Sequence, residues 1–203
     1  MQKINIKELK NPYRIKSKEY RKSLDSEHKK ELDLKIINNL QNLDEVRKST
    51  VILSYVSTQI EIETDCFLTK MLMQNKCVAV PKCVENTRNM NFYMINSLSD
   101  TFKQSFGVRE PNKNCPKLDD FENSVCIIPA LMFDKEGFRL GYGKGYYDIY
   151  LEQHYLSKKI AVGYDFQIVD ELPIEEHDIK PDFIISEKIT GKIINDNVQY
   201  ISS

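Results

Sequence analysis

Four of the seven glycines in the chain fall within nine residues, among cationic side chains and a carboxylate. The segment 137–151 reads GFRLGYGKGYYDIYL, with glycines at positions 137, 141, 143 and 145. Alternating glycines allow backbone N–H groups to approach an anion closely. Arg139 and Lys144 bring positive charge to the same place, and a helix predicted to begin at Gly145 adds the N–H groups of its first turn. Together these features predict a polyphosphate site.

The spacing of this segment differs from two well-known phosphate loops. A Walker A loop needs Ser or Thr after its lysine, whereas Lys144 is followed by Gly145. A dinucleotide fingerprint reads G-x-G-x-x-G, whereas these glycines read G-x-G-x-G. A glycine-rich surface turn is the alternative interpretation. The cations and Asp148, placed at a strand-to-helix junction, favour the phosphate site.

Asp148 falls in the first turn of the predicted helix. A carboxylate beside phosphates is a usual ligand for Mg²⁺, while an aspartate at this position also interacts favourably with the helix dipole. Position alone leaves both interpretations open. Tyr146 and Tyr147 are adjacent on the same helix and face different directions, so we expect at most one of them to point at a ligand.

The hydrophobic pattern predicts the elements that must position this segment. Residues 12–24 are predicted as a helix with Pro12 in its first turn, and a second helix is capped by Asp25 or Ser26. The second helix carries apolar residues at helical spacing, and we interpret the charges between them, including Asp33, as its solvent-exposed face. Its apolar residues are Leu32, Ile36, Ile37, Leu40 and Leu43.

Further along the chain, strands alternate with helices. Strands are predicted at 50–56, 77–80, 91–95, 125–129, 159–162 and 183–186, and Pro81 is expected to end the second of these. Helices are predicted at 63–74 and 145–156, and a loop at 112–123. This alternation predicts an α/β domain with a largely parallel sheet.

Composition argues against several classes of protein. With 29 basic and 30 acidic residues the formal net charge is −1, which gives no general case for a nucleic acid or membrane partner. No apolar stretch approaches the ~20 residues of a membrane helix, and the polar start has no signal-peptide core, so we expect a cytoplasmic protein. Five cysteines without a C-x-x-C pair indicate small, buried or half-buried thiols in a reducing compartment rather than disulfides or zinc ligands.

The segment 133–148, FDKEGFRLGYGKGYYD, resembles the signature of the 5-formyltetrahydrofolate cyclo-ligase family. Other matches to this family follow in order from Lys10 to about Ile194. The resemblance implies one domain over residues 1–203, with a three-layer, Rossmann-like α/β fold (NagB/RpiA/CoA transferase-like). The other matching segments are Lys10-x-x-x-Arg14, SYVSTQIEIET (54–64), VPK (80–82), NFY (91–93), FGVREP (106–111) and EEHDIKPDFIISE (175–187).

The resemblance also implies roles for particular residues. It assigns Asp148 and Asp178 to Mg²⁺, and we expect His177 to orient rather than bind the metal, because Mg²⁺ prefers oxygen. The implied catalytic residues are Lys144, Arg139 and Tyr146. The implied folate contacts are Val56, Glu61, Tyr142 and Tyr146. The implied ATP contacts are Lys10, Arg14, Arg139, Leu140, Gly141, Tyr142, Gly143, Lys144, Gly145, Tyr146 and Tyr147.

The implied reaction is the ATP- and Mg²⁺-dependent closure of 5-formyltetrahydrofolate to 5,10-methenyltetrahydrofolate, with release of ADP and phosphate. We expect a monomer that acts on these small molecules. Two alternatives use the same residues: another ATP-dependent phosphoryl-transfer enzyme, and a non-catalytic folate- or nucleotide-binding module. The first would release a phosphorylated acceptor, and the second would bind its ligands without consuming ATP.

Overall fold

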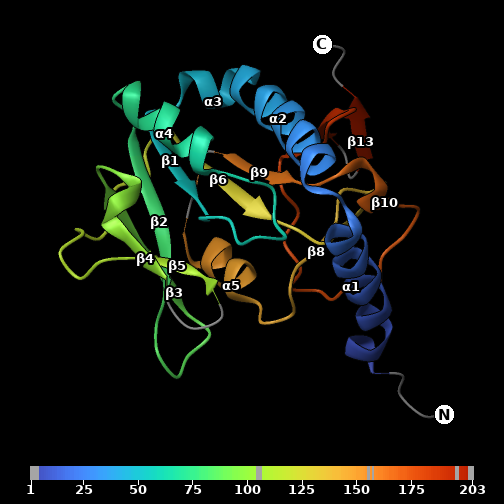
Figure 1. The fold of residues 1–203 in the computed structure, drawn as a ribbon. Helices are drawn as coiled ribbons and strands as arrows, with labels where there is room; N and C mark the ends of the chain where they lie inside the picture. Colours follow the sequence, from blue (N-terminus) through green and yellow to red (C-terminus); the bar gives the residue numbers. More distant parts are fainter. Residues whose placement is uncertain (1–4, 104–106, 155, 157, 195–196, 201–203) are drawn as a thin grey trace.

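The computed structural model describes residues 5–103, 107–154, 156, 158–194 and 197–200 (Figure 1). Phe106 of the FGVREP segment lies outside this range. Five helices are described: α1 (Ile6–Ser23), α2 (Ser26–Asn42), α3 (Asp44–Lys48), α4 (Asp65–Met73) and α5 (Tyr146–Gln153). Two short 3₁₀ turns, η1 (Leu98–Asp100) and η3 (Asp165–Gln167), join other elements.

An eight-stranded sheet forms the centre of the molecule. In spatial order its strands are β13 (Asn197–Tyr200), β12 (Thr190–Ile194), β11 (Phe183–Ile185), β9 (Lys158–Val162), β6 (Ser124–Pro129), β1 (Val51–Ser54), β2 (Cys77–Cys83) and β3 (Met90–Ile95). The run from β11 to β2 is parallel, and antiparallel strands extend it at both edges. The prediction of a largely parallel α/β sheet is confirmed.

The other strands of the described residues form two small sheets. One pairs β7 (Met132–Asp134) with β8 (Arg139–Leu140) and, on its other side, with β10 (Ile168–Val169). The other pairs β4 (Thr101–Lys103) with β5 (Arg109–Pro111). Our sequence prediction contained none of these five short strands, nor α3, β12 and β13.

Helices cover both faces of the central sheet, so the fold has three layers. Alternate residues of one strand enter different cores: Ile52 packs with α2, α3 and α4, whereas Val51 and Leu53 pack with residues of α5. Figure 1 shows α2, α3 and α4 over one face of the sheet and α5 beneath the other. None of the helices described is long and apolar enough to cross a membrane.

The second helix forms as predicted. The Asp25 side chain caps it by accepting hydrogen bonds from the backbone N–H groups of Glu27 and His28, and its predicted apolar residues are buried. One part of that prediction is wrong, because Asp33 is only 5% exposed and belongs to the buried face. All five cysteines are free thiols, but the expectation that they are buried or half-buried is wrong for Cys66 and Cys83, which are exposed.

Both prolines that we used as boundaries lie inside their elements. The first helix begins at Ile6 rather than Pro12, because the Asn5 side chain caps it by accepting from the Lys7 N–H at 3.1 Å. Pro81 does not end β2. It lies opposite Phe92, whose carbonyl accepts from Leu118 and so faces away from β2. At such a non-hydrogen-bonded position, past the pairing with β1, a missing N–H costs the sheet nothing.

Candidate active site

The two central strands, β1 and β6, end beside connections that leave on opposite faces of the sheet. From β1 the chain passes through α4 to β2, and from β6 it passes through α5 to β9 (Figure 1). Ligands of open α/β sheets bind in the crevice beyond the strand ends at such a point. Residues 55–64 follow β1, and the glycine-rich segment follows β6 through the β7–β8 hairpin.

The β7–β8 hairpin is closed by Asp134, whose Oδ1 accepts from the backbone N–H groups of Glu136 (3.1 Å) and Phe138 (2.8 Å). Gly137, with φ of +91°, completes this turn. The glycine-rich loop then runs into α5, whose N-cap residue is Gly145 in a left-handed conformation. No side chain caps α5, so the N–H groups of its first turn are available to an anion. The predicted helix start is confirmed to within one residue.

One face of α1 meets this loop with polar side chains. Lys10, Arg14, Ser17 and Arg21 follow one another at spacings of four, three and four residues, which places them on one side of a helix. Arg14 Nε donates to the carbonyl oxygen of Gly141 at 3.0 Å, and Ser17 Oγ donates to that of Leu131 at 2.6 Å. The helix therefore docks through hydrogen bonds to the loops beyond β6.

Glycines 141 and 143 make room for two guanidinium groups. A Cβ atom at Gly141 would lie 3.2 Å from Nη1 of Arg139, and one at Gly143 would lie 3.1 Å from Cζ of Arg14. Gly143 also has φ of +101°, which side chains rarely allow. The glycine pattern thus lets both arginines lie directly against the loop backbone.

Two of the cations predicted to bind phosphate are paired with the two carboxylates predicted to bind metal. Lys10 Nζ donates to Asp178 Oδ2 at 2.6 Å, and Arg139 Nη2 donates to Asp148 Oδ1 at 2.6 Å. Both cationic side chains are almost fully buried. The Ile179 N–H also contacts Asp148 Oδ1 at 3.4 Å, which brings the two carboxylate-bearing segments together.

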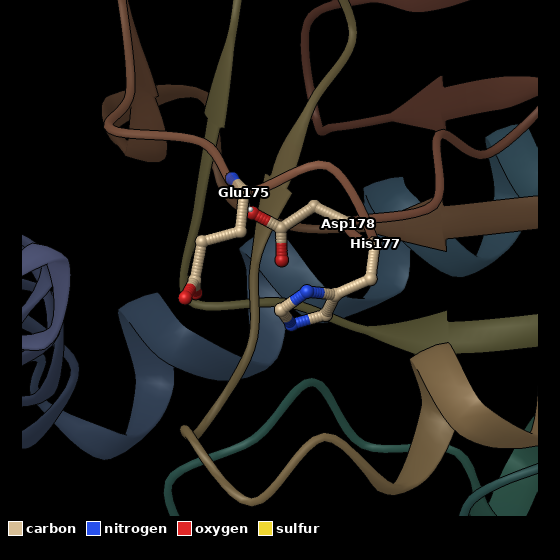
Figure 2. A group of neighbouring side chains, drawn as sticks. All are labelled: Glu175, His177 and Asp178. Atoms are coloured by element: carbon tan, nitrogen blue, oxygen red, sulfur yellow. Dashed lines mark hydrogen bonds between the residues drawn. The ribbon is translucent and has the colours of Figure 1, made fainter.

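Asp178 belongs to a compact group of possible metal ligands. Its carboxylate, that of Glu175 and the His177 ring each offer an atom within 4.8 Å of the others, and Figure 2 shows the three side chains converging from one turn. Lys10 Nζ also contacts Glu175 Oε2 at 2.8 Å, so a cation already lies among these carboxylates. The oxygen donors fit Mg²⁺, which prefers such ligands.

Two donors in the site have no acceptor among the described residues, which fits an anionic ligand. Arg139 Nε is buried and has no hydrogen-bond partner. Lys144 is exposed at the loop tip, and within the described residues it forms no ion pair. Burial lowers the pKa of Arg14, and the carboxylates of Asp178 and Glu175 oppose this shift, so all three side chains share one electrostatic environment.

The predicted folate residues lie differently from one another. Glu61 faces the crevice, where its Oε2 accepts from the N–H and hydroxyl groups of Thr58, each at 2.8 Å. Burial followed by the charge of Glu61 raises the pKa of Tyr142, so the phenol lies within the electrostatic influence of Glu61. Val56, in contrast, is 4% exposed in the core beneath α2 and α4, so its side chain offers a ligand little surface.

The remaining signature residues face away from the loop tip. Tyr146 directs its hydroxyl to the carbonyl oxygen of Thr87 at 3.4 Å, in the turn between β2 and β3. Tyr147 turns into the core, where burial raises its pKa and its hydroxyl has no partner. Leu140 is buried against Met132, so only its backbone can reach a ligand.

Sequence reasoning missed four polar residues that the structure brings to this place: Ser17, Arg21, Gln167 and Glu175. The Gln167 side chain donates to Ser17 Oγ (3.2 Å) and accepts from Arg21 (3.1 Å), which ties α1 to η3. For Ser17 and Arg21 the signal was present, because both continue the helical spacing of Lys10 and Arg14.

Known proteins that are similar to this chain share one family name. The mouse (Mus musculus) 5-formyltetrahydrofolate cyclo-ligase is 26% identical over 92% of this chain and 98% of its own, and that of Haemophilus influenzae is 32% identical over 82% and 91%. The solved 5,10-methenyltetrahydrofolate synthetase of Aquifex aeolicus superposes with a TM-score of 0.79 at 30% identity, covering 91% of this chain and 93% of that one. The model of the 5-formyltetrahydrofolate cyclo-ligase family matches residues 6–187, and the chain therefore belongs to this family of ligases.

Proposed function

We propose that the protein converts 5-formyltetrahydrofolate to 5,10-methenyltetrahydrofolate, using ATP and Mg²⁺ and releasing ADP and phosphate. One observation carries the proposal beyond family membership. Cations from α1, β8 and the glycine loop converge beyond β1 and β6, and two of them are already paired with carboxylates suited to Mg²⁺. These are the groups that phosphoryl transfer requires, and they adjoin Glu61.

Lys10 and Arg139, which are paired with carboxylates, can exchange these partners for the phosphates of a nucleotide. With nucleotide bound, Lys10 and Arg139 turn from the carboxylates to phosphate oxygens, and Arg14 adds a third positive charge beside the loop. Asp148 and Asp178 are then free to hold Mg²⁺, which supplies charge neutralisation to the phosphate oxygens. Lys144, at the exposed loop tip, is placed to meet the terminal phosphate.

The folate half of the site follows from Glu61 and Tyr142. Glu61 binds the polar edge of the pterin ring, and the Tyr142 ring packs against its flat face. The formyl oxygen attacks the γ-phosphorus and ADP leaves. N10 then attacks the activated carbon, and phosphate departs with the former formyl oxygen while N10 loses its proton. No nucleophilic side chain is needed for this sequence.

The test is an absorbance assay for the methenyl product, with ADP and phosphate measured in the same samples. We expect product only when 5-formyltetrahydrofolate, ATP and Mg²⁺ are all present, with one ADP released per ring closed. ADP release with a phosphorylated acceptor and no methenyl product would indicate another phosphoryl-transfer enzyme. Folate or ATP binding without ADP release would indicate a binding module.

A further inference from the structure

We propose that Arg21 is a positioning residue for the folate half of the site, which it serves by holding the Tyr142 phenol in place. The proposal rests on the proposed function, because that function assigns Tyr142 and Glu61 to the folate. Arg21 lies two helical turns beyond Arg14, on the same face of α1.

Arg21 is held rigidly inside the protein. Arg21 is only 3% exposed. Its Nη2 donates to the carbonyl oxygen of Ala130 at 2.5 Å and to Gln167 Oε1 at 3.1 Å. Its Nη1 donates to the Tyr142 hydroxyl at 3.2 Å. Ala130 and Gln167 therefore fix the guanidinium, and the guanidinium fixes the phenol.

The buried charge of Arg21 has no direct counter-ion: within the described part of the chain, no carboxylate lies at ion-pair distance from it. Two tyrosines connect it to carboxylates instead. Burial and then the charge of Glu61 raise the pKa of the Tyr142 phenol, and the Tyr164 ring lies 5.7 Å from the guanidinium while its hydroxyl donates to Asp33 at 2.6 Å. Since a buried charge needs compensation, the hydrogen bond between Arg21 and the Tyr142 phenol is favoured electrostatically.

Tyr142 depends on α1 for its position. It stands between Gly141 and Gly143, whose lack of side chains leaves it without support from its neighbours, and it is 37% exposed. Arg21 holds its hydroxyl, and the Lys18 ammonium lies 5.3 Å from the centre of its ring. Of these two contacts only that of Arg21 is a hydrogen bond from a buried side chain, so Arg21 fixes the phenol of the ring that packs on the folate.

The test measures binding of 5-formyltetrahydrofolate by calorimetric titration without nucleotide, and binding of a non-hydrolysable ATP analogue with Mg²⁺ separately. The variants are Tyr142→Phe, Arg21→Met and the double variant. We expect each single change to weaken folate binding by about tenfold to a hundredfold, the range for a hydrogen bond to a charged group. Because both changes break the same hydrogen bond, the double variant should bind no more weakly than the weaker single variant.

Ser49→Ala is the matched control, since it removes a hydrogen bond from another buried serine, at the end of α3, without touching Arg21 or Tyr142. We expect it to leave folate affinity within about twofold of wild type, and both Ser49→Ala and Arg21→Met to bind the ATP analogue normally. Equal loss of folate affinity in Ser49→Ala would show that the loss in Arg21→Met is not specific to Tyr142, and would overturn the proposal. Folate effects that multiply in the double variant would overturn it too.

The outcomes separate this proposal from the function on which it rests. If the wild-type protein neither binds nor converts 5-formyltetrahydrofolate, the proposed function fails and the role of Arg21 falls with it. If the wild type converts folate while Tyr142→Phe binds it normally, only the positioning role is refuted. Tyr142→Phe keeps the aromatic ring, so it decides the question even if Arg21→Met does not fold.

Discussion

Replacing Lys10 by Met tests whether the ammonium group of this lysine takes the place of a metal ion between Glu175 and Asp178. Its Nζ lies 2.8 Å from Glu175 and 2.6 Å from Asp178, and its side chain is only 5% exposed. Methionine keeps much of the length of the side chain and removes the charge. The two carboxylates are then left facing each other without a positive partner, while the rest of α1 keeps its contacts.

The expected loss of stability follows from the burial of the three groups. Removing one partner of a buried ion pair costs about 3–5 kcal/mol. The Glu175 side chain is 30% exposed and that of Asp178 is 14% exposed, so water relieves part of the repulsion and we expect about 3 kcal/mol. For a chain of this size that corresponds to a melting temperature lower by about 6–12 °C.

Binding of Mg²⁺ should restore part of the stability that Lys10→Met loses. Without the lysine, the carboxylates of Glu175 and Asp178 are free to bind a divalent ion, with the His177 ring beside them. At a free Mg²⁺ concentration ten times the dissociation constant, binding adds about 1.4 kcal/mol, or about 3–6 °C. Wild-type protein without nucleotide should gain less, because Lys10 already occupies the position.

The assay is thermal unfolding followed by circular dichroism, in EDTA and over a series of Mg²⁺ concentrations. Lys7→Met is the matched control, since Lys7 is an exposed lysine on the same helix. The reasoning is refuted if Lys10→Met melts within about 1 °C of Lys7→Met in EDTA. It is refuted equally if Mg²⁺ raises both melting temperatures by the same amount.

Three further predictions concern the loop and one thiol. Lys144→Ala should lower turnover by about 10²–10³ while leaving the melting temperature within about 2 °C, because the side chain is exposed; steady-state kinetics and unfolding curves check both. Gly143→Ala should weaken ATP binding about tenfold or more, measured by calorimetry, since its Cβ would press on Arg14 at a φ of +101°. Burial raises the pKa of Cys126 to about 12, so iodoacetamide at pH 8 should label exposed Cys66 and spare Cys126, as peptide mass spectrometry would show. Above the ordinary pKa of 9 the Cys126 thiol loses its proton in the unfolded chain but keeps it in the folded protein. Its contribution to the free energy of unfolding should therefore fall only as the pH rises from 9 towards 12.

The glycine-rich segment could be predicted well because its chemistry is local. Its four glycines, two cations and aspartate need no distant partner to indicate an anion-binding turn before a helix, and α5 begins at Tyr146 after Gly145. The buried strands of the central sheet were predictable for a similar reason, since runs such as residues 125–129 of β6 are apolar throughout.

The small sheet that carries Arg139 to the site was not predictable in this way. β8 has two residues and β10 has two, and β7 pairs Phe133 with Ile168, thirty-five positions away. Segments this short show no periodicity, so only the folded chain reveals the pairing. The same limit applies to Glu175, whose role depends on Lys10 at the other end of the sequence.

The first helix shows how a strong helical pattern can be overlooked. An apolar stripe usually marks the face that a helix buries, but α1 buries Lys10, Ser17 and Arg21. Such a face is stable here because the surface opposite consists of carbonyl oxygens and carboxylates beyond the strand ends, which need donors. A helix that packs over a site proposed to bind an anion has to carry donors on that face. Periodic donors without an apolar stripe are therefore a signal in their own right, and in this chain they run from Lys10 and Arg14, the proposed phosphate contacts, to Arg21.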